Sequence, residues 1–445
     1  MAVGSRSVLL NAALSFCAVL GSFAFTYALA VRFGAGSSPA VLAAALALGL
    51  MRRPDPPAAK ALVLKLVSLP LVALAAGLIG LSLVKVPPAG AAIFSCGVAL
   101  SVWLRGFGRK ASAIGRTIAL PLMSILVVPV HFQTSAGKAL GPLLILAAGA
   151  IAFVCTAGAS QLGAALHVAP EAPAEREQRP PREGTMPVAT RMALQMLTAL
   201  ALAFTFGMTL FPAHWPWVVL TAFIVCSGAI GRGDAIHKAI LRLGGATAGT
   251  IAASLIAQIV FPNPPAYAAA VFVVLFLGIW LRQINYAYWA GCATLIFALL
   301  QGTHGTAALA VFGARIACML IGAVCAIAAT WFVYPIRTEQ VVRRRVANAL
   351  KTLNDVLKGS PGDPEHSELL AALKHHAAEL ERVAPPVRLH RLILGARSSG
   401  DHPASLIEQT HALLTQAGTP NFDRAHVGAE LRRLAALLRA KQSVS

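Results

Sequence analysis

The sequence consists largely of apolar stretches of about 20 residues, separated by short polar segments. About 20 mostly apolar residues are what a helix needs to cross a bilayer, where the backbone must satisfy its hydrogen bonds internally. Hydrophobic residues make up 57% of the chain and charged residues 12%, whereas soluble domains carry roughly 25% charged residues. The chain is therefore predicted to be an all-α polytopic membrane protein. Its first apolar run has no small-residue cleavage site, so it is expected to be a span and not a signal peptide.

Twelve transmembrane helices are predicted, several of them short or interrupted. Their ranges are 8–31, 37–50, 61–84, 88–104, 117–131, 140–167, 188–211, 215–230, 240–261, 265–281, 286–301 and 308–334. With the N-terminus in the cytoplasm, 17 basic residues outside the spans fall on the cytoplasmic side, and only Arg32, Lys85 and Lys138 fall on the other side. This asymmetry follows the positive-inside rule. Both termini are therefore expected in the cytoplasm, with the chain crossing a bacterial inner membrane.

The formal net charge of +20 belongs mostly to the loops of the membrane region. Residues 1–336 hold 21 Lys/Arg and 6 Asp/Glu, a net +15, and residues 337–445 hold 16 and 11, a net +5. Because the basic residues follow the topology, no nucleic-acid partner is expected. The 7 cysteines lie in apolar runs and form no CxxC pair, so neither a disulfide framework nor a metal site is expected. No cofactor is predicted.

Changes in composition divide the chain into four segments. Residues 1–168 form a first six-helix membrane half, and a Pro- and charge-rich linker at 169–186 contains "APEAPAEREQRPPREG". Residues 187–336 form a second six-helix half. After Pro335 the sequence has apolar residues at i, i+3, i+4 spacing, with Asp363-Pro364 as a helix start. Residues 337–445 are therefore predicted to form a cytoplasmic helical bundle.

The membrane region contains two kinds of repeat. A shift of 177 residues aligns "PAGAAIFSCGVALSVWLR" with "PAYAAAVFVVLFLGIWLR", and Lys138 with Arg315. This predicts two homologous halves. A shift of 73 aligns Arg242 with Arg315, Gly249 with Gly322, and Thr221 with Thr294 across three spans. It predicts an inverted repeat inside the second half. Repeats of both kinds build many secondary transporters, whose sites lie at short or Pro/Gly-interrupted helices.

The stretch "KAILRLGGATAGT" contains a cluster of glycines beside basic residues. It fits no phosphate-binding motif, because no strand precedes it and an apolar run follows it. Gly245 and Gly249 instead form a GxxxG step, which lets a neighbouring backbone approach closely. The alternative is that these glycines expose backbone to a substrate path.

The second half resembles a known family. "HWPWVVLTAFIVCSGAIGRGDAIHKAILRLGGATAGT" is similar to the signature of the fusaric acid resistance protein (FUSC) family, which includes bacterial aromatic acid exporters. The ending "ARIACMLIGAVCAIAATWFVYPIR" is similar to the last span of that family. The resemblance covers residues 190–337. It implies export of small organic anions, aromatic carboxylic acids foremost.

The charges inside the membrane region agree with an anionic substrate. All six acidic residues before residue 337 lie in loops or the linker: Asp55, Glu171, Glu175, Glu177, Glu183 and Asp234. The cations are Arg315 near the outer end of the last span, its repeat partner Lys138, and Arg242 at the inner end of the ninth. An arginine can hold a carboxylate bidentately. The alternative for Arg315 is that it snorkels to the interface.

Several other residues are candidates for the substrate pathway. Five aromatic residues flank the short spans, and they can stack on an aromatic substrate or form a membrane-surface belt: Trp215, Trp217, Tyr286, Tyr288 and Trp289. His214 can titrate as a proton-coupling group or be a polar loop residue. Thr221 and Thr294 can donate hydrogen bonds to substrate or to their own helices.

These observations predict an inner-membrane exporter of small organic anions, most of all aromatic carboxylic acids of the fusaric acid or hydroxybenzoate type, and not an enzyme. The alternatives are an anion channel-like facilitator and a membrane-embedded envelope protein without transport activity. The expected partners are the substrate anion and the lipid bilayer, and a homo-oligomer or a periplasmic adaptor is left open.

Overall fold

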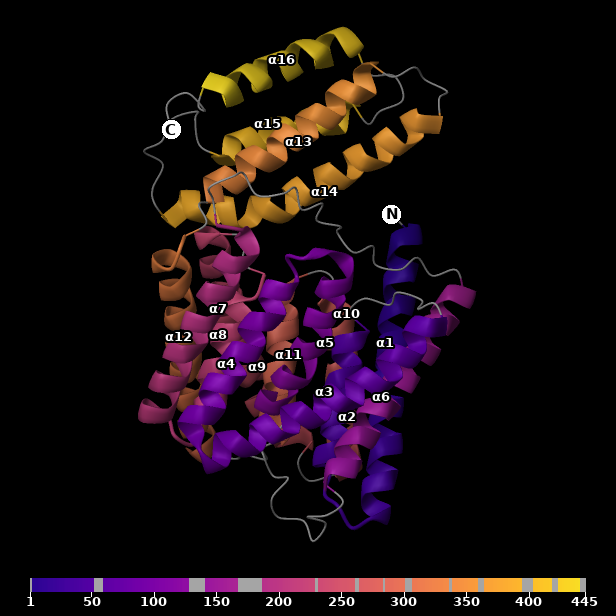
Figure 1. Cartoon of the computed structure of the whole chain (residues 1–445), viewed down its shortest axis with the longest axis vertical. Helices are drawn as coiled ribbons and strands as arrows, with labels where there is room; N and C mark the ends of the chain where they lie inside the picture. The colour runs from indigo at the N-terminus through magenta and orange to yellow at the C-terminus, as the bar shows by residue number, and fades with distance from the viewer. Residues whose placement is uncertain are drawn as a thin grey trace. The chain divides into compact units, whose positions relative to one another are not determined.

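The computed structural model describes most of the chain. The described residues are 2–51, 59–127, 141–166, 186–228, 231–260, 264–282, 285–300, 306–335, 338–358, 364–393, 403–417 and 423–440. All regular secondary structure within these ranges is helical. The helices fall into two compact units: unit 1 comprises residues 1–227 and 240–329, and unit 2 comprises residues 228–239 and 330–445 (Figure 1). The predicted linker at 169–186 lies outside the described residues except for Met186.

A helix occupies each of the ranges predicted to span the membrane. The helices are α1 (Ala2–Arg32), α2 (Ser38–Leu50), α3 (Ala59–Lys85), α4 (Pro87–Leu104), α5 (Gly108–Val127), α6 (Gly141–Ala165), α7 (Val188–Leu210), α8 (Trp215–Cys226), α9 (Arg232–Val260), α10 (Pro264–Leu281), α11 (Tyr286–Leu300) and α12 (Thr306–Phe332). Within the described part of the chain, seven of these (α1, α3, α4, α6, α7, α9 and α12) are long and apolar enough to cross a membrane. The polytopic all-α class is thereby confirmed, and the number of twelve spans stays a prediction.

Prolines start several of the short helices. Pro39 of α2 and Pro216 of α8 lie in the first two helical positions, where a proline loses no intrahelical hydrogen bond and its fixed φ suits the helix. Pro70, by contrast, lies inside α3. Gly149 of α6 packs against it, because a Cβ on this glycine would lie 3.0 Å from the Pro70 Cα.

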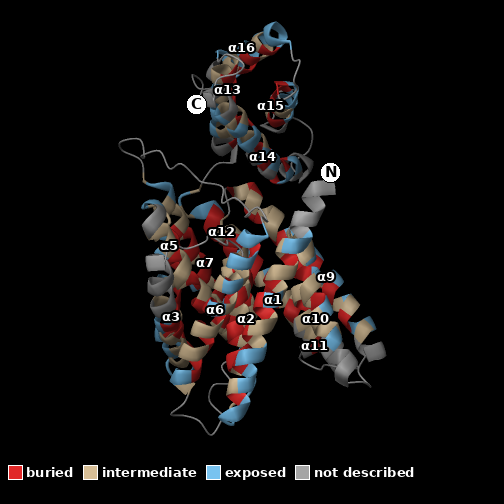
Figure 2. Cartoon of the chain, turned by 90° about the vertical axis from the view of Figure 1, so that its right-hand side faces the viewer, coloured by how far each residue is buried: buried red, intermediate tan, exposed pale blue. Residues whose placement is uncertain are grey.

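The burial pattern of unit 1 fits a lipid environment. Its interior is rich in alanine, for example Ala43 and Ala148, both 0% exposed. Large apolar side chains are exposed instead, such as Phe25 at 66% and Val324 at 62%. Figure 2 shows exposed residues along the membrane helices. Small residues let helix backbones approach in a bilayer, where no hydrophobic effect drives helices together. The exposed apolar surface is therefore the expected lipid-facing surface of unit 1.

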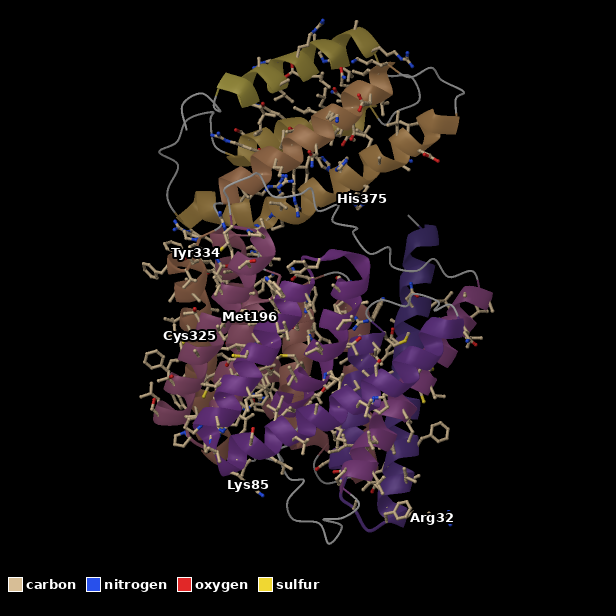
Figure 3. All side chains as sticks on the ribbon, in the orientation of Figure 1. Arg32, Lys85, Met196, Cys325, Tyr334 and His375 are labelled. Atoms are coloured by element: carbon tan, nitrogen blue, oxygen red, sulfur yellow. The ribbon has the colours of Figure 1, made fainter. Side chains whose placement is uncertain are left out.

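The contacts between the two halves of unit 1 include those of α5 with α8 and those of two further pairs of helices. The helix α4 packs on α7, and α10 packs on α1; the 177-residue shift relates these two pairs to each other. An edge-to-face contact between aromatic rings lies in each, with ring centroids 5.5 Å apart for Phe94 and Phe204 and also for Phe16 and Phe276. The packing is thus consistent with the predicted direct repeat. Arg32 and Lys85, both predicted to lie outside the cytoplasm, are at the same end of unit 1 (Figure 3).

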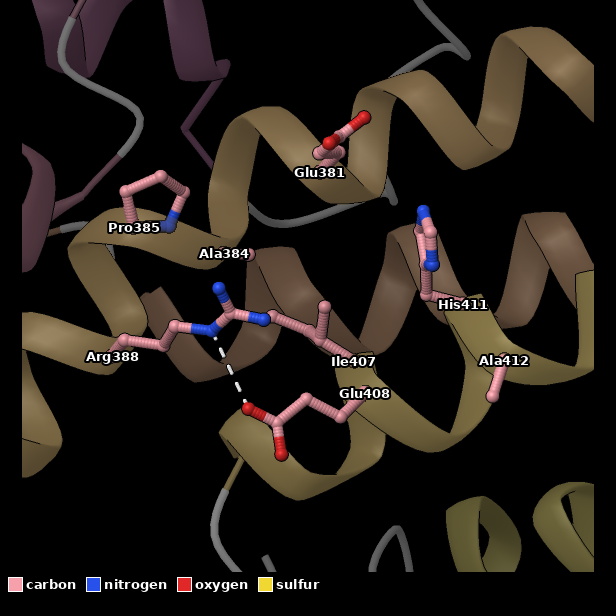
Figure 4. A pocket seen from close by; sticks show the side chains of 8 residues that line it. All are labelled: Glu381, Ala384, Pro385, Arg388, Ile407, Glu408, His411 and Ala412. Carbon is pink, nitrogen blue, oxygen red and sulfur yellow. Dashed lines mark ion pairs between the residues drawn. The ribbon is translucent and has the colours of Figure 1, made fainter. Parts of the chain in front are cut away.

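Unit 2 contains the C-terminal helices α13 (Thr338–Lys358), α14 (Pro364–Ile393), α15 (Pro403–Ala417) and α16 (Arg424–Ala440). Their apolar faces share one core, in which Val346, Leu353 and Leu434 are 0% exposed. A hollow of about 350 Å³ lies between α14 and α15, where Arg388 forms an exposed ion pair with Glu408 at 3.4 Å (Figure 4). Exposed pairs of this kind contribute little stability.

Unit 2 also contains the first turns of α9 and the end of α12. Arg232 donates a hydrogen bond from Nη2 to the carbonyl oxygen of Trp331 at 3.0 Å. Its guanidinium carbon lies 5.4 Å from the centroid of the Trp331 ring. This residue of α9 therefore ties the beginning of that helix to the last turn of α12.

Candidate functional site

Arg242 lies inside α9 and not at the end of a span. The helix begins at Arg232, eight residues before the start predicted from hydropathy, because its first turns are polar but still helical. Arg242 is thus ten residues, or about 15 Å of helix, from that end. Its side chain is 7% exposed. The prediction that Arg242 lies at the inner end of its helix is therefore corrected.

The guanidinium of Arg242 has hydroxyl partners on two other helices. Its Nε donates to Thr221 Oγ1 of α8 at 3.1 Å, and its Nη1 donates to the hydroxyl of Tyr286 at the start of α11 at 3.3 Å. Thr221 is completely buried. These bonds solvate part of the charge, yet neither partner carries a compensating negative charge.

Arg315 lies in α12, nine residues or about 14 Å after its start at Thr306. It is only 4% exposed. Its guanidinium carbon lies 3.9 Å from the ring centroid of Trp217, a separation typical of a cation–π interaction. A snorkelling arginine would expose its head group to water, so that alternative does not describe Arg315 in this structure.

The two arginines converge on one face of α8. Trp217, beside Arg315, and Thr221, beside Arg242, are four residues apart on this helix, so they lie on the same face about one turn from each other. The two positively charged side chains therefore contact this helix about one turn apart. We call Arg242, Arg315, Trp217, Thr221 and Tyr286 the arginine cluster. The sequence predicted most of its members but placed the two arginines near opposite ends of their spans.

Glycines bring the helices of the cluster together. A Cβ at Gly249 of α9 would overlap the carbonyl oxygen of Gly291 in α11, and a Cβ at Gly322 of α12 would overlap the carbonyl oxygen of Val218 in α8. Gly245 likewise packs on the carbonyl of Ala287. The interpretation of Gly245 and Gly249 as close-packing residues agrees with these contacts.

The two glycine contacts support the inverted repeat. A shift of 73 residues turns Gly249 into Gly322, and it turns Val218 into Gly291. The packing of α9 on α11 is therefore the repeat equivalent of the packing of α12 on α8. The same shift turns Trp217 into Ala290 and relates Tyr286 to Ala213. The backbone contacts at the glycines are therefore repeated in both parts of the inverted repeat, whereas the aromatic partners of the arginines are not.

The other predicted residues lie elsewhere. Trp215 packs against α7, with its ring centroid 5.5 Å from that of Phe204. His214 precedes α8 and is half-buried. Thr294 is buried in α11, 5% exposed. Lys138 lies outside the described residues.

Tyr286 has a different role in the cluster from either role expected of it. It was expected to stack on an aromatic substrate or to belong to a membrane-surface belt. Its hydroxyl instead accepts the hydrogen bond from Arg242. Asn285 accepts a hydrogen bond from the backbone N–H of Ala287 at 3.0 Å, which places Tyr286 at the first turn of α11. No local signal in the sequence pairs this hydroxyl with an arginine of α9.

The spans that carry the cluster contain no acidic side chain near it. Of the six acidic residues before residue 337, Asp234 is the one that falls within the described residues. It lies eight residues before Arg242 and forms an ion pair with Lys238 at 3.0 Å. The cluster is therefore a buried, net positive site, which suits an anion and disfavours a cation.

Comparison with known proteins agrees with this part of the sequence. Residues 197–329 match a family model described as fusaric acid resistance protein-like. The match includes every residue of the arginine cluster, and it confirms the family resemblance over that range. No curated protein and no solved structure matches the chain.

Proposed function

We propose that this protein is an inner-membrane transporter that exports small organic anions, aromatic carboxylic acids of the fusaric acid or hydroxybenzoate type foremost. The observation that carries the proposal is the pair of buried arginines on one face of α8, in helices whose single acidic residue, Asp234, lies eight residues before Arg242. The match of residues 197–329 to fusaric acid resistance-like proteins supports the transport class.

The charge of the cluster argues for a carboxylate. Insertion scales put the cost of one arginine at the centre of a membrane helix at about 2.5–3.5 kcal/mol. Here two such residues lie on one face of α8, where Arg242 donates to two hydroxyl groups and Arg315 lies against an indole ring. A bound carboxylate adds charge-assisted hydrogen bonds and offsets the repulsion between the two guanidiniums. Binding of an anion therefore lowers the free energy of the arginine pair.

The aromatic partners argue for a flat substrate. Trp217 lies against the guanidinium of Arg315, a planar group whose N–H donors lie in its own plane. A carboxylate binds an arginine in this plane through two parallel hydrogen bonds. An aromatic ring conjugated to the carboxylate lies in nearly the same plane and can extend toward the apolar walls of α8 and α11.

The membrane potential is a sufficient driving force. With a negative interior, a monovalent anion moving outward gains about 2.3 kcal/mol per 100 mV, which corresponds to a gradient of roughly fifty-fold. No proton-carrying carboxylate is required in the spans for this mode of export. We accordingly propose potential-driven transport, with both termini in the cytoplasm and with assembly as a homo-oligomer or with a periplasmic adaptor.

Export into inverted membrane vesicles tests the proposal. Labelled 4-hydroxybenzoate should accumulate in vesicles that contain the wild-type protein when an interior-positive potential is imposed. Arg242→Gln and Arg315→Gln should each lower the initial rate at least tenfold, because each removes a charge-assisted contact worth about 1.5–3 kcal/mol. Arg32→Gln, which changes an exposed arginine at the end of α1, should leave the rate unchanged.

Two outcomes would contradict this function. Equal accumulation in vesicles with and without the protein would exclude transport of this substrate class. Wild-type rates in both cluster variants, at equal protein abundance, would exclude the arginine cluster as the binding site.

A further inference from the structure

The end of α4 is fixed against the beginning of α7, where the two halves of unit 1 meet. Trp103 donates a hydrogen bond from its indole Nε1 to Thr190 Oγ1 at 3.2 Å. Three residues further along, Gly106 packs so closely on α7 that a Cβ would overlap Ala189. These two contacts hold the backbones of both helices in register at this end.

The same contacts place two arginines at one junction. Arg105 lies between Trp103 and Gly106, and Arg191 directly follows Thr190. Both arginines are half-buried. Within the described part of the chain, Nε of Arg191 is buried without a hydrogen-bond partner. The helices α4, α5 and α7 contain no acidic residue, so the junction is positively charged.

Exposed aromatic rings border the two arginines. The ring centroids of Trp103 and Phe107 are 4.4 Å apart, and the ring planes make an angle of 63°. Their side chains are 38% and 56% exposed. Aromatic side chains at the end of an apolar helix lie at the level of lipid headgroups. The basic residues between the spans predict that this end of unit 1 faces the cytoplasm.

We propose that this junction, formed by Trp103, Arg105, Phe107, Thr190 and Arg191, binds the phosphate headgroup of an anionic phospholipid. Arginine forms bidentate hydrogen bonds with phosphate, and basic pockets between spans on the cytoplasmic side suit such headgroups. The exposed rings contact the glycerol and the upper acyl chains. The bound lipid thereby joins the two halves of the membrane region at a place away from the arginine cluster.

The internal repeat provides a matched comparison. The 177-residue shift turns Trp103 and Arg105 into Trp280 and Arg282 of the α10 end, which packs on α1. The α1 equivalents of Thr190 and Arg191 are Ala13 and Leu14. The second junction therefore has one arginine where the first has two, and it has no threonine to hold the indole. It lacks the groups needed to clamp a phosphate.

Native mass spectrometry of the full-length protein in detergent tests the site, with phosphatidylglycerol and phosphatidylcholine titrated separately. Wild-type protein should retain one phosphatidylglycerol in preference to phosphatidylcholine. Arg191→Gln should lower its affinity about fivefold, and the Arg105→Gln/Arg191→Gln double variant about 25-fold, since each basic residue contributes roughly a factor of five. Arg282→Gln should leave the affinity unchanged.

Two results with the variants would overturn the assignment: wild-type lipid affinity in the double variant, or a loss of affinity in Arg282→Gln equal to that in Arg191→Gln. Displacement of the lipid by millimolar glycerol phosphate would also overturn it, because it would identify a soluble phosphate ligand. Each variant is first checked for a wild-type melting temperature. If the double variant does not fold, the single variant Arg191→Lys provides the comparison. It keeps the charge but loses the bidentate geometry. Its affinity for phosphatidylglycerol should therefore lie between that of wild type and that of Arg191→Gln.

Discussion

Trp217 determines how Arg315 is presented within the arginine cluster. The indole lies 3.9 Å from the guanidinium carbon, so it covers one face of that group and limits its rotation. The negative face of the ring also attracts the positive charge electrostatically. Trp217 is therefore expected to position the arginine for substrate, in addition to any contact with the substrate ring.

Replacing this tryptophan should weaken substrate binding in a graded manner. Trp217→Leu removes a cation–π interaction worth about 0.5–2 kcal/mol, so the KM for 4-hydroxybenzoate should rise roughly two- to thirty-fold. Trp217→Phe keeps a weaker ring and should give an intermediate KM. Initial rates of vesicle uptake over a range of substrate concentrations provide the measurement.

The position of Trp215 supplies the control for that series. Its ring packs on Phe204 of α7, so Trp215→Phe should leave the KM unchanged even if it lowers protein abundance. A wild-type KM in Trp217→Leu, with the protein inserted normally, would show that the stacked pair has no role in binding.

The helices that carry the cluster depend on close backbone approach at particular glycines. A Cβ at Gly249 would overlap a carbonyl oxygen of α11, whereas no atom lies within 4 Å of a Cβ placed at Gly244 in the same helix. The two positions differ in packing but have the same residue type and lie in the same helix. They therefore separate the effect of packing from the effect of glycine flexibility.

Alanine substitutions at these two glycines should have opposite effects on stability. Gly249→Ala should destabilise the protein by about 1–3 kcal/mol through overpacking, and Gly244→Ala should stabilise it by roughly 0.5–1 kcal/mol because alanine is the better helix former. Thermal unfolding of the purified protein in detergent measures both. A lower melting temperature for Gly244→Ala than for Gly249→Ala would contradict the packing described for α9 and α11.

Sequence periodicity predicted the helices better than it predicted their depth. Hydropathy located α9 from its apolar part, but the polar residues from Arg232 onward continue the same helix. That extension moves Arg242 inward by more than two turns relative to the predicted start. Contacts between helices were even harder to predict from the sequence, because no local pattern indicates that the Tyr286 hydroxyl contacts Arg242. The repeats were the exception, since equivalent residues imply equivalent contacts.

At the scale of the whole molecule, the membrane helices and the C-terminal helices have separate interiors. The core of α13 to α16 is formed by its own leucine and valine side chains, and the residues of the arginine cluster all belong to unit 1. The sequence predicted this division from the change in composition after Pro335. Unit 2 additionally takes in the first turns of α9, through the contact of Arg232 with Trp331, which no change in composition indicated.

Removing the C-terminal helices should therefore leave transport measurable. A chain ending at Arg337 keeps the arginine cluster, Arg232 and Trp331. Vesicles that contain it should therefore still accumulate 4-hydroxybenzoate. We expect the rate to fall by no more than about tenfold, which corresponds to about 1.4 kcal/mol. Arg315→Gln in the truncated chain should then lower the remaining uptake at least tenfold, which would show that the residual flux uses the same site. If the truncated protein inserts at normal abundance but shows no uptake, the C-terminal helices are required for transport. That result would favour a membrane-embedded protein that acts through its C-terminal helices over a transporter.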